Sequence, residues 1–257
     1  MKVTFLGTGT SQGVPIIGCK CEVCLSKNEK DKRLRSSIMI EEKGKRFVID
    51  TGPDFRQQML RENVDALDAI IYTHEHKDHL AGIDDVRAFN YIQKKKMDVY
   101  ASVRVQEAII REIPYAFTEE KYPGVPEIIL HKIENKKFTV EGVEFHPIQV
   151  MHHRMPVLGF RVNDFTYITD ANFISDEEMA KVKGSKAVVL NALRHEKHIS
   201  HFNLEEALQL AKKIGAEKTY LTHISHQLGK YDEVIKSLPE NVFLAYDGLS
   251  IDLQNPI

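Results

Sequence analysis

Residue types that bind metal ions crowd one short segment of this sequence. Positions 73–79 read Thr-His-Glu-His-Lys-Asp-His, with three histidines and an aspartate between positions 74 and 79. The apolar run at 68–72 predicts a buried strand, so the segment forms the loop at the carboxyl end of that strand. A rigid strand aims reacting groups at such a loop while the loop itself stays accessible. The residue types and their position together predict a functional site in this loop.

The spacing within this segment suits metal ions. In an extended turn, His74 and His76 point two imidazoles toward one ion. Asp78 and His79, on the next turn of the chain, are placed to reach a second ion nearby. The alternative is a polar surface loop whose histidines bond to water or to the backbone. Because the chain has only 12 histidines in 257 residues, such a cluster is rare by chance, and we favour the metal site.

Later strands end in the same kinds of residue. Three further apolar segments predict strands that lead into histidine or aspartate: His152 and His153 after 143–150, Asp170 after 165–169, and His223 after 219–222. Reacting groups collect at the carboxyl ends of strands in mixed α/β folds. Four such endings in one chain predict a single shared site.

The cysteines also stand together. The chain has three, Cys19, Cys21 and Cys24. An odd number packed this tightly is a poor disulfide framework. In a reducing compartment, three thiolates at this spacing indicate most of a tetrahedral zinc site, which needs a fourth ligand from elsewhere. The alternative, three unrelated small apolar side chains, does not explain why they cluster.

The composition is that of an ordinary globular protein. Hydrophobic residues make up 42% of the chain and charged residues 28%, which allows a sizeable core, and we expect residues 1–257 to form one domain. The net charge of −2 gives no global attraction for a nucleic-acid backbone. No apolar run approaches the ~18 residues of a membrane span and no signal segment begins the sequence, so we expect a cytoplasmic protein.

Predicted strands and helices alternate along the chain. The glycine-rich segment 7–13 follows a strand at 2–6, and we interpret it as a wall of the site, because the proline-containing 14–18 cannot open a helix. A β-hairpin is predicted at 37–50, with helices at 55–62, 83–93, 103–113 and 203–214. Asp50, at the end of the hairpin, either orients a ligand histidine or caps the turn, and the sequence leaves both open.

The pattern His74-x-His76-x-Asp78-His79 resembles the signature of the metallo-β-lactamase superfamily. This resemblance implies an α/β (α+β) fold, a four-layer αββα sandwich with a dinuclear metal site along one edge. The glycine-rich start with its cysteines, the segment 221–227 and the ending Asp247-Gly248 are similar to the cyclic phosphodiesterases of the carbon–phosphorus lyase (phosphonate-degradation) pathway. The pyrroloquinoline-quinone biosynthesis B proteins share the start and the cysteine cluster.

The resemblance also implies a role for each residue. It assigns His74, His76 and His153 to one metal, Asp78, His79 and His223 to the other, and Asp170 as the bridge. His153 is preferred to His152 because it lies six residues before Gly159, the spacing of the family. Cys19, Cys21, Cys24 and His226 are implied to form a separate structural zinc site. His201 is implied to serve the leaving group or the phosphate, although His195 and His198 depart from the family pattern and leave open which of the three enters the site.

We therefore expect a metal-dependent hydrolase, a phosphodiesterase that cleaves a small cyclic ribose phosphate or nucleotide-like diester. Two divalent ions, zinc or manganese, lower the pKa of a water between them, while Asp78 and His201 act as the catalytic residues. The alternatives are a protein like the pyrroloquinoline-quinone biosynthesis B or tRNA 3′-processing metalloproteins, or a non-catalytic metal-binding scaffold. The expected partner is a small phosphodiester, not a membrane or a nucleic acid, and a homodimer stays open.

Overall fold

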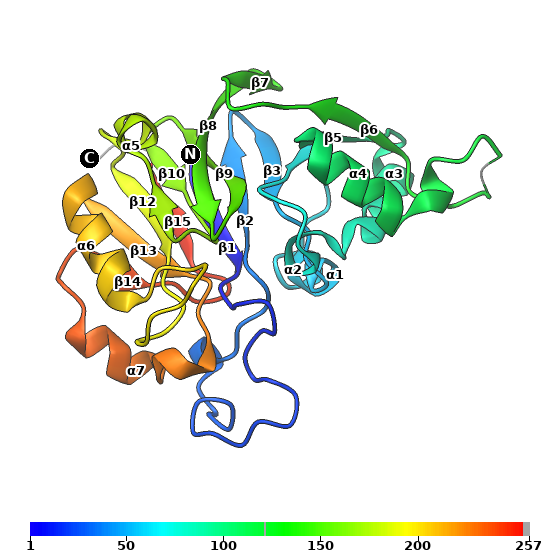
Figure 1. Ribbon diagram of the computed structural model, residues 1–257. Coiled ribbons are helices and arrows are strands. Elements are labelled where there is room, and N and C mark those ends of the chain that lie inside the picture. Colours follow the sequence, from blue (N-terminus) through cyan, green and yellow to red (C-terminus); the bar gives the residue numbers. More distant parts are fainter. Residues whose placement is uncertain (121, 254–257) are drawn as a thin grey trace.

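Two β-sheets packed face to face form the centre of the computed structural model, which describes residues 1–120 and 122–253 (Figure 1). The first sheet contains, in spatial order, β15 (Ser250–Asp252), β1 (Lys2–Gly7), β2 (Ser37–Glu42), β3 (Lys45–Ile49), β4 (Ala69–Ile71), β5 (Met97–Ala101) and β6 (Ile128–Lys132). The second contains β11 (Phe173–Ile174), β8 (Val143–His152), β9 (Met155–Val162), β10 (Phe165–Tyr167), β12 (Ala187–Asn191), β13 (Lys218–Thr222) and β14 (Val242–Leu244), with β7 (Phe138–Val140) paired to β8.

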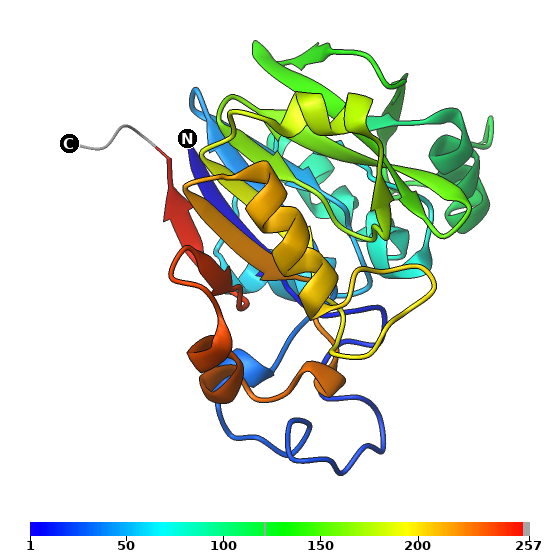
Figure 2. The same cartoon turned by 60° about the vertical axis from the view of Figure 1, so that its left-hand side comes forward.

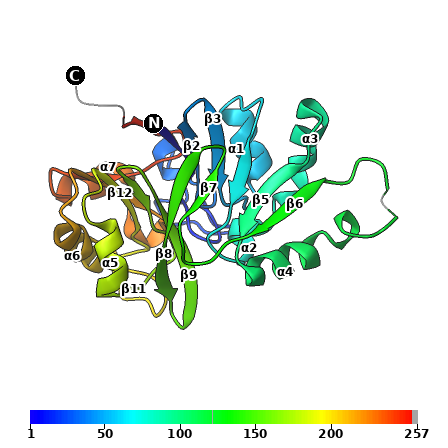
Figure 3. The same cartoon turned by 90° about the horizontal axis from the view of Figure 1, so that it is seen from above.

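Helices cover the outer face of each sheet, and Figure 3 shows α3 and α4 on one side of the molecule with α5 and α6 on the other. The helices are α1 (Phe55–Arg61), α2 (Lys77–Leu80), α3 (Arg87–Gln93), α4 (Val103–Glu112), α5 (Asp176–Val182), α6 (Leu204–Ile214) and α7 (Tyr231–Val234). Short 3-10 turns lie at Glu29–Asp31, Ile83–Val86, Pro114–Ala116, His226–Leu228 and Ile235–Ser237. The predicted four-layer αββα sandwich is confirmed.

Strands in the middle of the two sheets, such as β4 and β12, are largely apolar and buried because both of their faces are covered. In β3, Phe47 and Ile49 point between the sheets, whereas Val48 packs under the helices of the first sheet. Aromatic rings join the sheets across the middle layer: the ring centroids of Phe47 and Phe145 lie 5.4 Å apart in an edge-on arrangement. This packed interior fixes the strand ends and therefore the loops that follow them.

Most predicted elements are present, with three differences near the site. The predicted helix at 83–93 begins as a 3-10 turn and becomes α-helical only at α3. The histidine segment contains a short helix, α2, at its end. The strand predicted to end at residue 150 continues to His152. Among the described residues, no helix is long and apolar enough to cross a membrane.

Candidate metal centre

The strand-end loops converge as predicted. His74, His76, Asp78 and His79 follow β4, Asp170 follows β10, and His223 follows β13. Ligand atoms of Asp78, His79, Asp170 and His223 all lie within 4.8 Å of one another. The ring of His74 lies 4.2 Å from that of His79 and 4.7 Å from that of His76, measured between centroids. Side chains from both sheets thus meet at one edge of the sandwich.

Asp170 is the centre of this cluster. Its carboxylate is buried, with Oδ2 3.1 Å from His79 Nε2 and 3.2 Å from His223 Nδ1, and Oδ1 3.0 Å from His201 Nε2. Burial would raise the pKa of this carboxyl, but His223 and His79 outweigh burial and hold the pKa well below its usual range. Asp170 therefore stays ionised. Its carboxylate lies within 4.8 Å of ligand atoms of His79 and His223 and also of His152, as a bridging ligand requires.

Two nitrogen atoms in the cluster lack hydrogen bonds. Nε2 of His74 and Nε2 of His79 are buried and have no hydrogen-bond partner among the described residues. Buried polar atoms are nearly always satisfied, so each such atom needs an explanation. His79 Nδ1 donates to Asp50 Oδ2 at 2.7 Å, so the neutral form of this ring has its lone pair on Nε2. A metal ion is the partner that two orphan imidazole nitrogens beside carboxylates fit.

The electrostatics of the cluster agree with this fit. Burial lowers the pKa of His74 well below its usual value and lowers that of His223 to about 3, so both rings are neutral and keep a lone pair for a metal. Burial also acts on His79, but the carboxylates of Asp170, Asp78 and Asp50 outweigh it and raise the pKa of that ring. The three carboxylates around His79 concentrate negative charge, which a divalent cation would neutralise.

Asp50 orients the ligand histidines. Its buried carboxylate accepts hydrogen bonds from His79 Nδ1, from the Thr73 hydroxyl at 2.7 Å and from the Thr73 backbone N–H at 2.9 Å. The Thr73 hydroxyl lies 2.9 Å from His74 Nδ1, so one carboxylate aligns two ligand rings. Of the two roles left open by the sequence, the orienting role is the one the structure displays.

Replacing Asp50 with asparagine is expected to lower metal affinity by roughly 10–100-fold. The amide has a single acceptor oxygen, so it cannot accept from the Thr73 backbone N–H as well as from the Thr73 hydroxyl and His79 Nδ1. Titration of metal-free protein with zinc measures this change. Asp65→Asn is the matched control, since Asp65 is exposed and pairs with Arg46. Equal zinc affinity in Asp50→Asn and Asp65→Asn would contradict the orienting role.

The preference for His153 over His152 is wrong. His152 is the last residue of β8 and is buried, with its ring 5.0 Å from that of His76 and 4.6 Å from that of His201. Its Nδ1 donates to the Ser200 carbonyl at 2.9 Å, which leaves Nε2 free. His153 is exposed in the following turn, at a φ of 56°. Successive residues of a strand point to opposite sides, so only one of the two can face the cluster.

This pair of neighbours provides a sharp test of the ligand set. His152→Ala is expected to lower hydrolase activity and metal affinity by roughly 100-fold, whereas His153→Ala should behave like the unmodified protein. Activity per chain and bound metal are measured for both variants. The assignment fails if His153→Ala is the more damaging change.

Of the three histidines between β12 and α6, the structure brings His201 into the cluster. His201 is buried, and its ring stacks on that of His223 with centroids 4.8 Å apart. His198 contacts His201 from behind, with their Nδ1 atoms 3.1 Å apart. His195 is exposed and donates from Nε2 to the Leu228 carbonyl at 2.9 Å, outside the cluster.

Most of the chain matches a known protein family. Residues 45–224 match the family model described as a beta-lactamase superfamily domain. The chain belongs to the metallo-β-lactamase superfamily. The fold of this superfamily implies binding of divalent metal, and the described residues include His and Asp groups that could hold it.

Within the metallo-β-lactamase superfamily, the chain resembles the PhnP family. A crystal structure of a new diphosphatase from that family is 37% identical, with a TM-score of 0.92 and 98% of both chains covered. The Zn²⁺-bound PqqB of Methylobacterium extorquens, 18% identical with 98% of this chain and 100% of that chain covered, shares the fold at a TM-score of 0.78. An octanoyltransferase of Porphyromonas gingivalis is 38% identical over 97% of this chain. The chain spans about half the length of that relative (51%).

The cysteine cluster of this superfamily member forms a second candidate metal site. Cys19, Cys21, Cys24 and His226 place their ligand atoms within 4.8 Å of one another, with the sulfurs 3.3–3.6 Å from His226 Nδ1. The backbone N–H of Cys24 donates to the Cys21 sulfur and, with the other hydrogen bonds, lowers the pKa of that thiol to about 6. Three thiols and one imidazole suit a tetrahedral zinc ion. Figure 2 shows the loop that carries the cysteines, in blue, at the bottom of the molecule.

The glycine-rich segment forms a wall of the metal centre, as predicted. Its backbone pairs with the segment after β13, where Thr10 N–H donates to the Ile224 carbonyl at 3.1 Å. The Thr10 hydroxyl lies 3.3 Å from His223 Nε2. Opposite this wall, Gly52 has no room for a side chain, because a Cβ there would lie 2.1 Å from the Asp78 carbonyl oxygen. Thr10 and Gly52 were missed in the sequence because their roles depend on contacts between distant loops.

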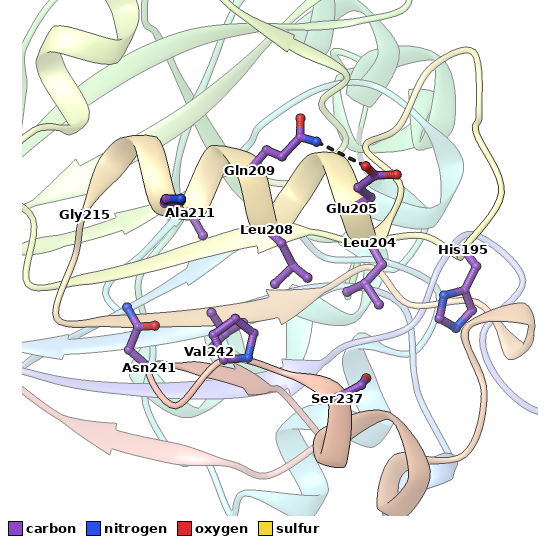
Figure 4. Close-up of a pocket in the computed structure, with 12 residues that line it drawn as sticks. His195, Leu204, Glu205, Leu208, Gln209, Ala211, Gly215, Ser237, Asn241 and Val242 are labelled. Carbon is purple, nitrogen blue, oxygen red and sulfur yellow. Dashed lines mark hydrogen bonds between the residues drawn. The ribbon is translucent and has the colours of Figure 1, made fainter.

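A cavity of about 750 Å³ lies apart from the metal centre, between α6 and the segment that leads into β14 (Figure 4). Its floor is apolar, with Leu204, Leu208 and Val242 pointing into it, and His195 stands at one end. Of the predicted site residues, only His195 lines this cavity. The predicted chemistry therefore belongs to the strand-end cluster and not to this cavity.

Proposed function

We propose that this protein is a phosphodiesterase that hydrolyses a small phosphodiester, with two divalent ions, zinc or manganese, at the strand-end cluster and one zinc at the cysteine cluster. The contact between His201 Nε2 and Asp170 Oδ1, at 3.0 Å, carries the proposal. This contact puts a proton donor beside the carboxylate that lies close to His79 and His223 and also to His152. The 37% identical diphosphatase of the PhnP family supports a phosphate ester or anhydride as the substrate.

The chain's own residues would divide the work as follows. His74, His76 and His152 would hold one ion, Asp78, His79 and His223 the other, and Asp170 both. When bound, the ions supply Lewis acidity that lowers the pKa of a water and neutralises charge on the phosphate. Asp78, partly exposed at the edge of the cluster, would position the attacking water.

The bond changes balance with His201 as the proton donor. The water oxygen forms a new bond to phosphorus, and the bond from phosphorus to the leaving oxygen breaks. His201 Nε2 gives its proton to that leaving oxygen, and the ring regains a proton from solvent. The water gives up one proton to solvent as its oxygen attacks, which offsets the proton that His201 regains. The other proton stays on the phosphomonoester, and the second product is an alcohol.

Access to the cluster favours a small substrate. His76, a member of the proposed ligand set, is exposed, so an ester can approach from the solvent side. The net charge of −2 offers no broad basic surface for a long nucleic acid. These observations favour a cyclic ribose phosphate or a nucleotide-like diester.

Acyl chemistry is the second candidate. Because a protein named octanoyltransferase is 38% identical over 97% of this chain, hydrolysis of an octanoyl thioester is the competing activity. The name describes a protein of which this chain spans only about half, so the matching half need not carry that transfer. Metal centres of this type can polarise a thioester carbonyl as they do a phosphate.

A substrate panel separates these functions. Metal-loaded protein is assayed with bis-(p-nitrophenyl) phosphate, 2′,3′-cyclic AMP, p-nitrophenyl phosphate and octanoyl-coenzyme A. We expect the two diesters to be hydrolysed at least about 100-fold faster than the monoester and the thioester. Turnover of the thioester without turnover of either diester would overturn the proposal in favour of acyl chemistry.

A further inference from the structure

His198 stands directly behind the proposed proton donor. Its Nδ1 lies 3.1 Å from His201 Nδ1 and 3.2 Å from the Ser200 hydroxyl, and the same hydroxyl lies 3.1 Å from His201 Nδ1. His201 is thus held between two groups: Asp170 at Nε2, and His198 with Ser200 at Nδ1. Sequence spacing had left His198 without a role.

The backbone decides which nitrogen donates in this pair. The Ser200 N–H lies 3.4 Å from His198 Nδ1, and a backbone N–H can only donate. His198 Nδ1 therefore carries a lone pair. The proton between the two rings then belongs to His201 Nδ1, whether it reaches His198 directly or through the Ser200 hydroxyl. Both routes require a proton on His201 Nδ1.

The surroundings of His198 keep it an acceptor. The ring is half-buried, and burial together with the neighbouring His201 and Arg194 lowers its pKa, so it is neutral near pH 7. On the far side of His201, the Asp170 carboxylate accepts from Nε2 at 3.0 Å. As a proton donor His201 carries protons on both nitrogens, and the contacts at its two ends hold the ring with the Nε2 proton toward the cluster.

We propose that His198 is a positioning residue that fixes the Nδ1 proton and the ring orientation of His201, so that Nε2 delivers the proton to the leaving oxygen. The inference rests on the proposed phosphodiesterase function. The contact resembles the one by which a carboxylate orients the histidine of a serine-hydrolase triad and stabilises its imidazolium. Here a neutral imidazole takes the place of the carboxylate.

The test compares two leaving groups. The ribose hydroxyl of 2′,3′-cyclic AMP needs a proton to depart, whereas p-nitrophenolate departs as an anion. His198→Leu removes the acceptor, and we expect kcat for the cyclic nucleotide to fall by about tenfold or more while kcat for bis-(p-nitrophenyl) phosphate changes by less than about twofold. His201→Ala should lower kcat for the cyclic nucleotide by more than His198→Leu does. His198→Asn restores an oxygen acceptor at the place of Nδ1 and should recover most of the loss.

Each outcome has one meaning. Equal losses for both substrates in His198→Leu, or no recovery in His198→Asn when both variants melt like the unmodified protein, would overturn the positioning role. Full activity of His198→Leu on the cyclic nucleotide would do the same. If the unmodified, metal-loaded protein hydrolyses neither diester, the proposed function fails and the inference falls with it. Loss of the positioning role alone leaves the unmodified protein an active diesterase.

Discussion

Replacing Asp170 with asparagine is expected to abolish diesterase activity, with kcat falling roughly 10³-fold or more. The carboxylate contacts His79 and His223 through Oδ2 and His201 through Oδ1, and it lies within 4.8 Å of a ligand atom of His152. One change therefore touches ligands of both proposed ions and the proton donor. An amide keeps the volume but loses the charge that bridging requires. Its NH₂ group would also point a donor at a nitrogen that is itself a donor or a metal ligand.

Metal content distinguishes the loss of a bridging carboxylate from simple unfolding of the variant. Asp170→Asn should lose at least one of the active-site ions while keeping the zinc of the cysteine cluster, measured by elemental analysis of purified protein. Asp176→Asn is the control, because Asp176 is exposed and pairs with Lys213 at the surface. If Asp170→Asn keeps full metal content and turns over diesters at the normal rate, the bridging role is wrong.

Replacing Cys21 with serine is expected to cause the largest loss of stability. The Cys21 sulfur lies 3.3 Å from His226 Nδ1 and ties the loop of 19–24 to the turn at His226–Leu228. A structural zinc ion contributes directly to folding free energy, so losing it should lower the melting temperature by roughly 10 °C. One zinc per chain should disappear, while the strand-end ligands remain in place.

The control for Cys21→Ser is a change to a neighbouring residue that does not belong to the cysteine cluster. Lys20→Ser alters an exposed neighbour on the same loop and should leave both zinc content and melting temperature unchanged. Melting is followed by circular dichroism, and metal is counted on the same samples. Cys21→Ser protein with full zinc and unchanged melting would show that the cysteine cluster does not hold a structural ion.

The parts of the candidate metal centre that could be predicted from the sequence are the residues that directly follow a strand. Continuous apolar runs mark strands covered on both faces, and each run fixes the place of the residue that follows it. His74, Asp170 and His223 could therefore be assigned to one edge before any coordinates. His226 lies more than 200 residues from Cys19, and only the family resemblance paired it with the cysteines.

Features that depend on strand length or loop conformation could not be predicted in this way. His152 shares the alternation of Ile148 and Val150 along β8, but this becomes visible only once the strand is known to extend to residue 152. The family spacing to Gly159 pointed instead to His153. Likewise, the choice of His201 over His195 depends on the path of an irregular loop, and the role of Asp50 depends on contacts with Thr73 and His79.

The most direct test of the central claim is metal content measured together with hydrolysis of bis-(p-nitrophenyl) phosphate, before and after chelation. We expect about three metal ions per chain and a diesterase activity that chelation removes and added zinc or manganese restores. One tightly held zinc with no turnover, even with added manganese, would contradict it. The cysteine cluster would then be a metal site, and the strand-end cluster would not be a catalytic centre.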